Sequence, residues 1–165
     1  MVPEIDDDTV IRLAGTKRLD LFSEALADGV KTKPVIIGAY TFLKLARYKG
    51  TKTSSDFVEQ TAAAYSELLK KFSRLGAEWI QFDEPSLVKD MTAEDIQLFT
   101  SLYKKILPAK GDVKVIAQTY FGDVRDCYKE LCTLDFDGIG LDFVEGKKSL
   151  ELVKTNGFPK DKLLM

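Results

Sequence analysis

The stretch that decides the fold is AEWIQFDEPSLV, residues 77–88. Its apolar run WIQF, residues 79–82, predicts a short buried strand that ends abruptly at Asp83, Glu84 and Pro85. Proline has no backbone N–H for a sheet ladder, and it holds the residue before it in extended geometry. Two carboxylates therefore follow a strand directly, and in parallel α/β folds ligands bind at this end of the strands. We expect either a working site here or a copy of one.

Strand-like and helix-like patterns alternate on both sides of this stretch. Expected strands begin near residues 35, 79, 113, 138 and 163, and expected helices cover Arg18–Asp28, Ser54 or Ser55 to Leu75, Thr92–Leu107, a segment around 124–131 and another around 150–156. The segment PVIIG, residues 34–38, predicts a buried strand, and residues 39–50 predict a loop or a helical turn. Repeated strand–helix units predict a parallel sheet.

The length of the chain limits how much of such a fold it can hold. A complete (β/α)8 barrel takes about 250 residues, so 165 residues provide about four units and the start of a fifth. The alternatives are a small open sheet or part of a (β/α)8 TIM barrel. Because the final LLM resembles a strand cut short, we predict an α/β fold of the second kind, with residues 1–165 as a single incomplete domain.

Composition excludes several classes of function. The 24 basic and 26 acidic residues give a net charge of −2, whereas nucleic-acid binding requires a basic face. No apolar run approaches the roughly 20 residues that span a bilayer, and the acidic N-terminus does not resemble a signal peptide. Cys127 and Cys132 form no disulfide framework, so we expect reduced thiols, a cytoplasmic setting, and neither nucleic acid nor membrane as a partner.

The chain contains no histidine, the usual acid–base group near neutral pH and the commonest metal ligand. Its absence excludes a Ser-His-Asp triad, a Cys-His pair and an HExxH zinc site. Zinc needs about three or four protein ligands, and two cysteines in one helix supply too few. We therefore predict no metal site in this chain.

Polar side chains follow several predicted strands. The candidate substrate-binding residues are Asp83, Glu84, Gln118, Tyr120 and Asp142. In a barrel they would surround one mouth. Neighbouring residues of a strand point to opposite faces, so Asp83 and Glu84 cannot both face the lumen. The structural alternative is that these carboxylates accept hydrogen bonds from backbone N–H groups at helix starts, each stabilising by about 1 kcal/mol.

A basic patch follows the first expected strand. It consists of Lys44, Arg47, Lys49 and Lys52. The patch could hold an anion, but a solvated loop is the simpler interpretation and the one we favour.

Four segments in this order resemble cobalamin-independent methionine synthases: KPVIIGAYTFLKLARYKG, AEWIQFDEPSLV, TYFGDV and DFDGIGLDFVEG. The resemblance runs from about Lys33 to the end and is to part of the N-terminal half of that family. It implies a parent of two (β/α)8 barrels that transfers a methyl group from 5-methyltetrahydrofolate polyglutamate to homocysteine, giving methionine. It also implies zinc in the C-terminal barrel, where the metal binds the sulfur of homocysteine.

This sequence differs from the catalytic half of the family at the positions that bind zinc there. The segment that would carry its zinc-binding His and Cys is AQTYF here, residues 117–121. A zinc-binding Glu of that half falls near Asp142. Asp83 matches the Asp that binds the homocysteine amino group there, but without zinc no group holds the sulfur. The resemblance thus implies no catalytic residue and no cofactor in this chain.

Three hypotheses follow. The first is a fragment of the methyltransferase that is inactive alone, serves as scaffold and part of the folate-cleft wall, and has the rest of the parent polypeptide as its partner, with folate and homocysteine bound only by the whole enzyme. The second is a free-standing module that binds an amino acid without catalysis. The third is an incomplete barrel that self-associates through uncovered sheet edges and apolar faces.

Overall fold

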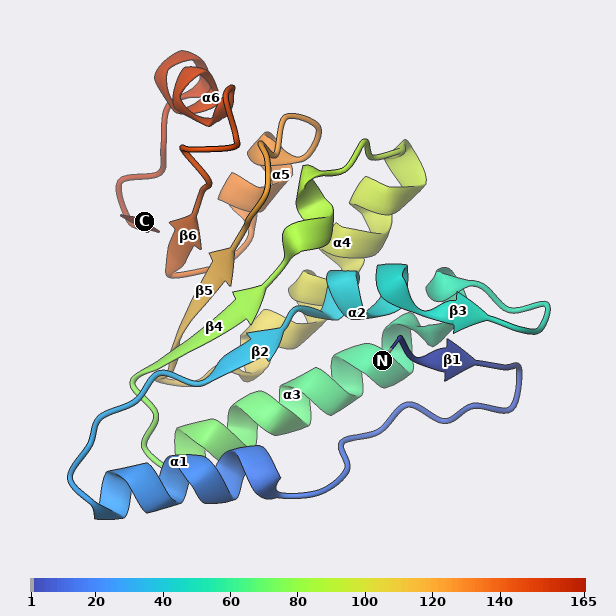
Figure 1. The fold of residues 1–165 in the computed structure, drawn as a ribbon, viewed down its shortest axis with the longest axis vertical. Helices are drawn as coiled ribbons and strands as arrows, with labels where there is room; N and C mark the ends of the chain where they lie inside the picture. The colour runs from blue at the N-terminus through green and yellow to red at the C-terminus, as the bar shows by residue number, and fades with distance from the viewer. Residues whose placement is uncertain (1) are drawn as a thin grey trace.

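A computed structural model describes residues 2–165 as an α/β fold with parallel strands (Figure 1). The main sheet has five strands in the order β2-β4-β5-β6-β7, and each neighbouring pair is parallel. Its strands are β2 Val35–Ile37, β4 Trp79–Asp83, β5 Lys114–Gln118, β6 Gly138–Gly140 and β7 Leu163–Leu164. A separate parallel pair consists of β1 Glu4–Ile5 and β3 Arg47–Tyr48. The predicted α/β class, the parallel strands and the strand positions are confirmed.

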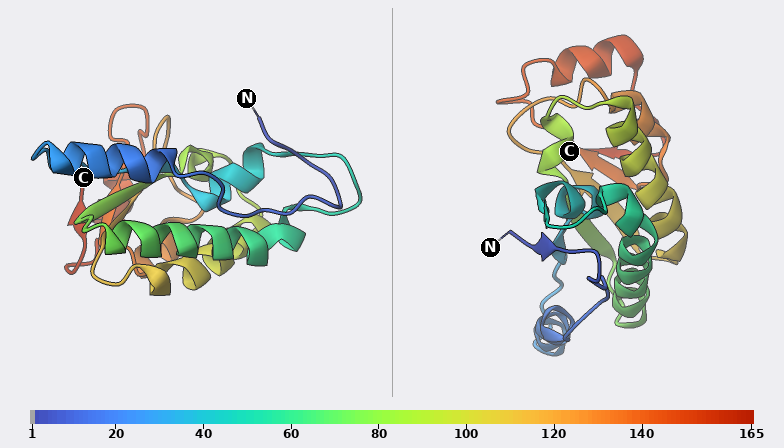
Figure 2. Two further views of the ribbon diagram at one scale, coloured as in Figure 1. Left: turned by 90° about the horizontal axis from the view of Figure 1, so that it is seen from below. Right: turned by 90° about the vertical axis from the view of Figure 1, so that its right-hand side faces the viewer.

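The strands are connected by helices and short helical turns. The helices are α1 Lys17–Ala27, α2 Ala39–Leu45, α3 Val58–Arg74, α4 Ala93–Ile106, α5 Tyr128–Thr133 and α6 Ser149–Asn156, and the 3-10 turns are Ser54–Phe57, Pro85–Val88 and Leu107–Ala109. The long helices α3 and α4 lie side by side against the sheet (Figure 2). None of the helices in residues 2–165 is both long and apolar enough to span a membrane.

The core lies between the sheet and these two helices. Phe82 in β4 is fully buried, and its ring centroid lies 5.6 Å from that of Tyr65 in α3 and 6.0 Å from that of Tyr103 in α4. Because side chains alternate along a strand, Gln81 and Asp83 point to the opposite face of the sheet. This alternation separates an aromatic core from a face that carries polar groups.

Three sequence predictions need correction. The strand at residues 34–38 is not buried, because β2 is an edge strand and its Val35 and Ile37 are 41% and 43% exposed. Residues 39–50 form helix α2 and strand β3 rather than a loop or a single turn. The long helix is preceded by a 3-10 turn, and the residue that caps this turn is Thr53, whose backbone N–H donates to Asp56 Oδ2 at 2.8 Å. Neither Ser54 nor Ser55 is the cap.

Candidate functional site

Glu84, directly after β4, is fully buried and caps helix α2. Its carboxylate oxygens accept the backbone N–H groups of Tyr40 at 3.0 Å and Thr41 at 2.8 Å, and Tyr103 donates its hydroxyl to Oε1. Gly38 makes room for this arrangement, because a Cβ there would lie 2.1 Å from Glu84 Cδ. Burial raises the pKa of Glu84 to about 7, although its hydrogen bonds favour the charged form. Glu84 therefore has a structural role in this chain, and its contact with substrate stays a prediction.

Asp83 faces the other side of the sheet and belongs to a polar network. Its Oδ1 accepts hydrogen bonds from Gln81 Nε2 at 2.7 Å and from the hydroxyl of Tyr120 at 2.9 Å. Gln81 is only 7% exposed, and its Oε1 accepts a hydrogen bond from the ammonium group of Lys33. Asp83 and Glu84 thus lie on opposite faces of the sheet, as the alternation of side chains along a strand requires.

Tyr120 is held as a hydrogen-bond donor in this network. Burial and the neighbouring Asp83 raise the pKa of Tyr120 to about 12, so its hydroxyl stays protonated at neutral pH. Gln118 lies at the register position of Asp83 on β5, and its Nε2 donates to the carbonyl of Thr119 at 3.1 Å. Its amide lies over Gly140, where a Cβ would be 2.0 Å from Gln118 Oε1.

Asp142, after β6, connects two loops. Its Oδ2 accepts the backbone N–H of Phe121 at 2.8 Å, and its Oδ1 accepts those of Val144 and Glu145 at 2.8 and 2.9 Å. Hydrogen bonds from these backbone N–H groups lower the pKa of Asp142. Its partners are loop N–H groups rather than those of a helix start. The structure therefore brings Asp83, Gln118 and Tyr120 together at the carboxyl ends of the neighbouring strands β4 and β5. Asp142 supports the loop beside them.

The sequence analysis missed Gln81 and Phe121 as members of this region. Gln81 could have been found, because it precedes Asp83 by two residues in a strand and must share its face. No local sequence pattern indicates the role of Phe121. Its backbone conformation, with φ of 70°, is accompanied by a hydrogen bond from its N–H to Asp142, which belongs to another loop.

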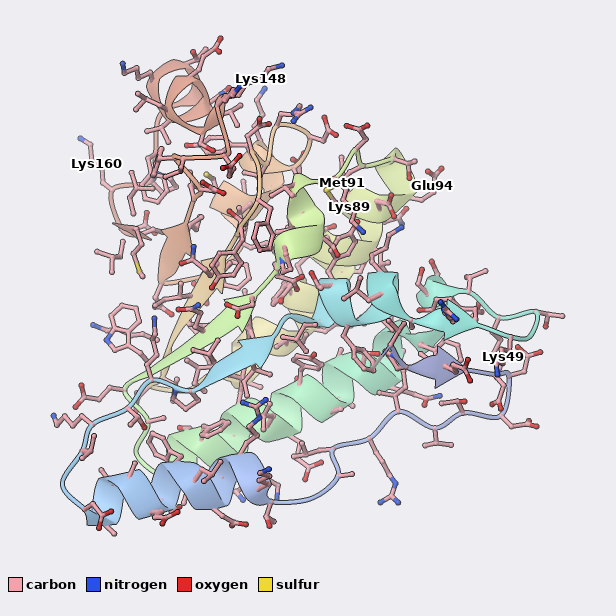
Figure 3. All side chains as sticks on the ribbon, in the orientation of Figure 1. Lys49, Lys89, Met91, Glu94, Lys148 and Lys160 are labelled. Carbon is pink, nitrogen blue, oxygen red and sulfur yellow. The ribbon has the colours of Figure 1, made fainter. Side chains whose placement is uncertain are left out.

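Three of the four side chains of the basic patch are engaged within the chain. Lys44 pairs with Asp95 at 2.8 Å, and Lys49 pairs with Glu4 at 2.7 Å. Lys52 donates to the backbone carbonyl of Asp7. Figure 3 shows Lys49 at the end of the molecule where β1 and β3 pair. Acidic residues of the chain therefore already occupy much of this surface.

The residues that the structure describes do not fit a zinc ion. Within residues 2–165, no group of three or more His, Cys, Asp or Glu side chains lies close enough to hold a metal. Cys127 and Cys132 are both free, and burial raises the pKa of the Cys127 thiol to about 12. Cys127 is fully buried and behaves as an apolar side chain rather than as a thiolate ligand.

Comparison with known proteins agrees with this architecture. Residues 1–165 match the family described as "Cobalamin-independent synthase, N-terminal domain". The chain belongs to this family. It is 49% identical over 164 residues to the 5-methyltetrahydropteroyltriglutamate–homocysteine methyltransferase of Lactococcus lactis strain IL1403, and 52% identical to that of Streptococcus pneumoniae strain G54. Each alignment covers 99% of this chain and 22% of the relative.

Solved structures related to this cobalamin-independent synthase domain share its fold. A putative vitamin-B12 independent methionine synthase from Listeria monocytogenes has a TM-score of 0.70 at 18% identity, covering 82% of this chain and 47% of that one. A B12-independent methionine synthase from Shewanella sp. W3-18-1, in complex with selenomethionine, has a TM-score of 0.62 at 17% identity, covering 87% and 48%. The predicted family is confirmed, and the five parallel strands form an open part of a barrel-type fold.

Proposed function

We propose that this chain is part of a methyltransferase that moves the methyl group of 5-methyltetrahydropteroyltriglutamate to homocysteine to make methionine. The observation that carries the proposal is 49–52% identity over 164 residues to relatives named for this reaction. Because the chain spans 22% of their length, the activity is proposed for a longer polypeptide that includes this segment, with the rest of that polypeptide as its partner. Zinc that binds the homocysteine sulfur is assigned to that remainder. Two free cysteines suit a reducing, cytoplasmic setting.

Within that enzyme we assign the segment a supporting role, as a single incomplete domain that forms scaffold and part of the folate-cleft wall. Its most deeply buried carboxylate, Glu84, is engaged in capping α2. Burial raises the pKa of both cysteine thiols, which therefore stay protonated at neutral pH. Within residues 2–165, the acidic side chains do not gather into a metal site. These features supply no nucleophile and no Lewis acid, so the isolated chain should be inactive.

A replacement experiment tests the proposed function. The corresponding segment of the Lactococcus lactis enzyme is exchanged for this chain, and methionine formation is measured with homocysteine and the methylated triglutamate as substrates. We expect the folded chimera to retain activity and the 165-residue chain alone to form no methionine. A folded chimera without activity, or an active isolated chain, would contradict the proposal.

Metal analysis and calorimetry test the supporting role. Elemental analysis of the purified chain should find no stoichiometric zinc after dialysis against zinc-containing buffer. Calorimetry with homocysteine and with methionine should show no binding. Tight binding of either amino acid would favour the alternative function, a free-standing amino-acid-binding module.

A further inference from the structure

Glu84 is a fully buried carboxyl group that no cation neutralises, since it takes part in none of the ion pairs of residues 2–165. The titratable groups around it, on α2, α3, α4 and the residue before α5, are Tyr40, Tyr65, Tyr103 and Cys127. Burial raises the pKa of each of these four groups, so all of them are uncharged at neutral pH. Asp95, which faces Tyr40, is paired with Lys44 at 2.8 Å. A negative charge on Glu84 would therefore be buried without an opposite charge.

Hydrogen bonds run in both directions between the start of α2 and the turn after β4. In addition to the two N–H groups that Glu84 accepts, the N–H of Ala39 donates to the hydroxyl of Tyr103 at 3.2 Å, and this hydroxyl donates to Glu84. In return, Thr41 Oγ1 accepts the backbone N–H of Ser86, in the turn, at 3.1 Å. The first turn of α2 and the turn after β4 are thus joined through one buried carboxyl group and its neighbours.

Helix α2 depends on these contacts because it is short and borders open space. It has seven residues, whereas isolated helices shorter than about 12–15 residues are barely stable in water. Phe42 and Leu45, on α2, line a cavity of about 670 Å³ together with Val2 and Ile37. This cavity gives the helix room to move away from the turn.

We propose that helix α2 is a pH-sensitive switch, docked on the turn Pro85–Val88 while Glu84 carries a proton and released when this proton passes to water. Release lets water reach the ionised carboxylate, which its three donors alone do not stabilise enough in the docked state. Burial raises the pKa of Glu84 from 4.5 to about 7, so the docked state loses stability as the pH rises from about 4.5 to about 7. The switch goes beyond the proposed methyl transfer and does not depend on it.

Native-state hydrogen exchange of the 165-residue chain, followed by NMR, tests the switch. The protection factors of the Tyr40 and Thr41 amides, which allow for the intrinsic pH dependence of exchange, should fall about tenfold or more between about pH 5 and about pH 7.5. Low concentrations of urea should not change them, because a local opening exposes little surface. The amide of Phe99, in the core of α4, should be better protected and should respond to urea. Equal protection and equal urea dependence at all three amides would overturn the switch.

Two substitutions connect the opening to Glu84. Glu84→Gln cannot ionise, so the protection of the α2 amides should become independent of pH over this range. Tyr103→Phe removes a donor to the carboxylate and thereby disfavours its charged form further. In this variant the protection should level off at a higher pH than in the unchanged chain. Carbon-13 NMR of the Glu84 carboxyl group follows its titration directly, and circular dichroism checks that each variant is folded.

Tyr48→Phe is the matched control, because it loosens the same helix without touching Glu84. The hydroxyl of Tyr48 donates to the carbonyl of Leu43, near the other end of α2, at 2.8 Å. Its loss should lower the protection of the α2 amides by a similar factor at every pH and leave the shape of the pH curve unchanged. The same pH dependence in Glu84→Gln as in the unchanged chain, or identical pH curves for Tyr103→Phe and Tyr48→Phe, would overturn the switch.

Discussion

At the scale of single residues, Asp83 and Glu84 show how one position along a strand changes the role of a carboxylate. Asp83 is the last residue of β4 and Glu84 directly follows it, yet Glu84 lies under α2 with three donors and Asp83 lies on the opposite face of the sheet with two. Burial raises the pKa of Glu84 to about 7. The buried residue thus links the start of α2 to β4, and it also makes folding sensitive to pH.

The stability of the chain should therefore fall as Glu84 ionises. Because its pKa is higher in the folded chain than its ordinary value of 4.5, its contribution is fully present below about pH 4.5 and is lost as the pH rises through about 7. Glu84→Gln does not titrate, so the stability advantage of the unchanged chain over this variant should shrink by roughly 2–3 kcal/mol between about pH 5 and pH 8. Urea unfolding measures the difference. Exposed Glu151→Gln is the control, and equal pH slopes for Glu84→Gln and the unchanged chain would disprove the prediction.

At the scale of elements, the helix starts depend on local capping that a sequence can reveal. Thr92 and Asp95 form the predicted capping box at α4, in which Thr92 Oγ1 accepts the Asp95 N–H at 3.2 Å and Asp95 Oδ2 accepts the Thr92 N–H at 3.3 Å. The start of α2 is different, because its N–H groups are capped by Glu84, which is more than forty residues away in sequence. Local rules can find the first cap but not the second.

Removal of the local cap at the start of α4 should lower the free energy of unfolding by the amount typical of a capping residue. Thr92→Ala leaves the Asp95 N–H without its side-chain acceptor, so the free energy of unfolding should fall by about 1 kcal/mol. Thr155→Ala, at an exposed site in α6, should change it by less than about 0.5 kcal/mol. Chemical denaturation of the two variants measures both effects. A Thr92→Ala chain as stable as Thr155→Ala would show that the box contributes nothing.

At the scale of the whole molecule, the sheet has edges at β2 and β7 and a face that is only partly covered. Val35, Ile37 and Leu163 are 41%, 43% and 49% exposed. Unpaired strand edges next to apolar side chains favour association with another chain. In a longer polypeptide, further strands would cover these groups, whereas in the 165-residue chain another copy can do so.

We therefore expect the 165-residue chain to form dimers or larger species as its concentration rises. Val35→Lys places a charge on the exposed side of the edge strand and should shift the population toward monomer. Leu150→Lys, which changes an exposed leucine on α6, should not. Sedimentation velocity over a range of concentrations measures both. A chain that stays monomeric at high concentration, or equal effects of the two variants, would contradict the prediction.

The sequence by itself determined the order of the five main-sheet strands and of the helices other than α2, because these depend on local periodicity, on caps such as Thr92 and on stops such as Gly76, which has a positive φ of 81°. It did not reveal α2 or the short strands β1 and β3. It also determined the family, through the AEWIQFDEPSLV stretch and the segments around it. It further required Asp83 and Glu84 to face opposite sides of the sheet, since side chains alternate along a strand.

Only the tertiary structure decided which of the two carboxylates is buried. That choice depends on which face of β4 the helices α3 and α4 cover, and therefore on packing among residues far apart in sequence. The same holds for the exposure of β2, which follows from its place at the sheet edge, and for the left-handed turn at Phe121, which needs Asp142 from another loop. Contacts of this kind are set by the three-dimensional arrangement of the elements, and no local pattern of residues encodes them.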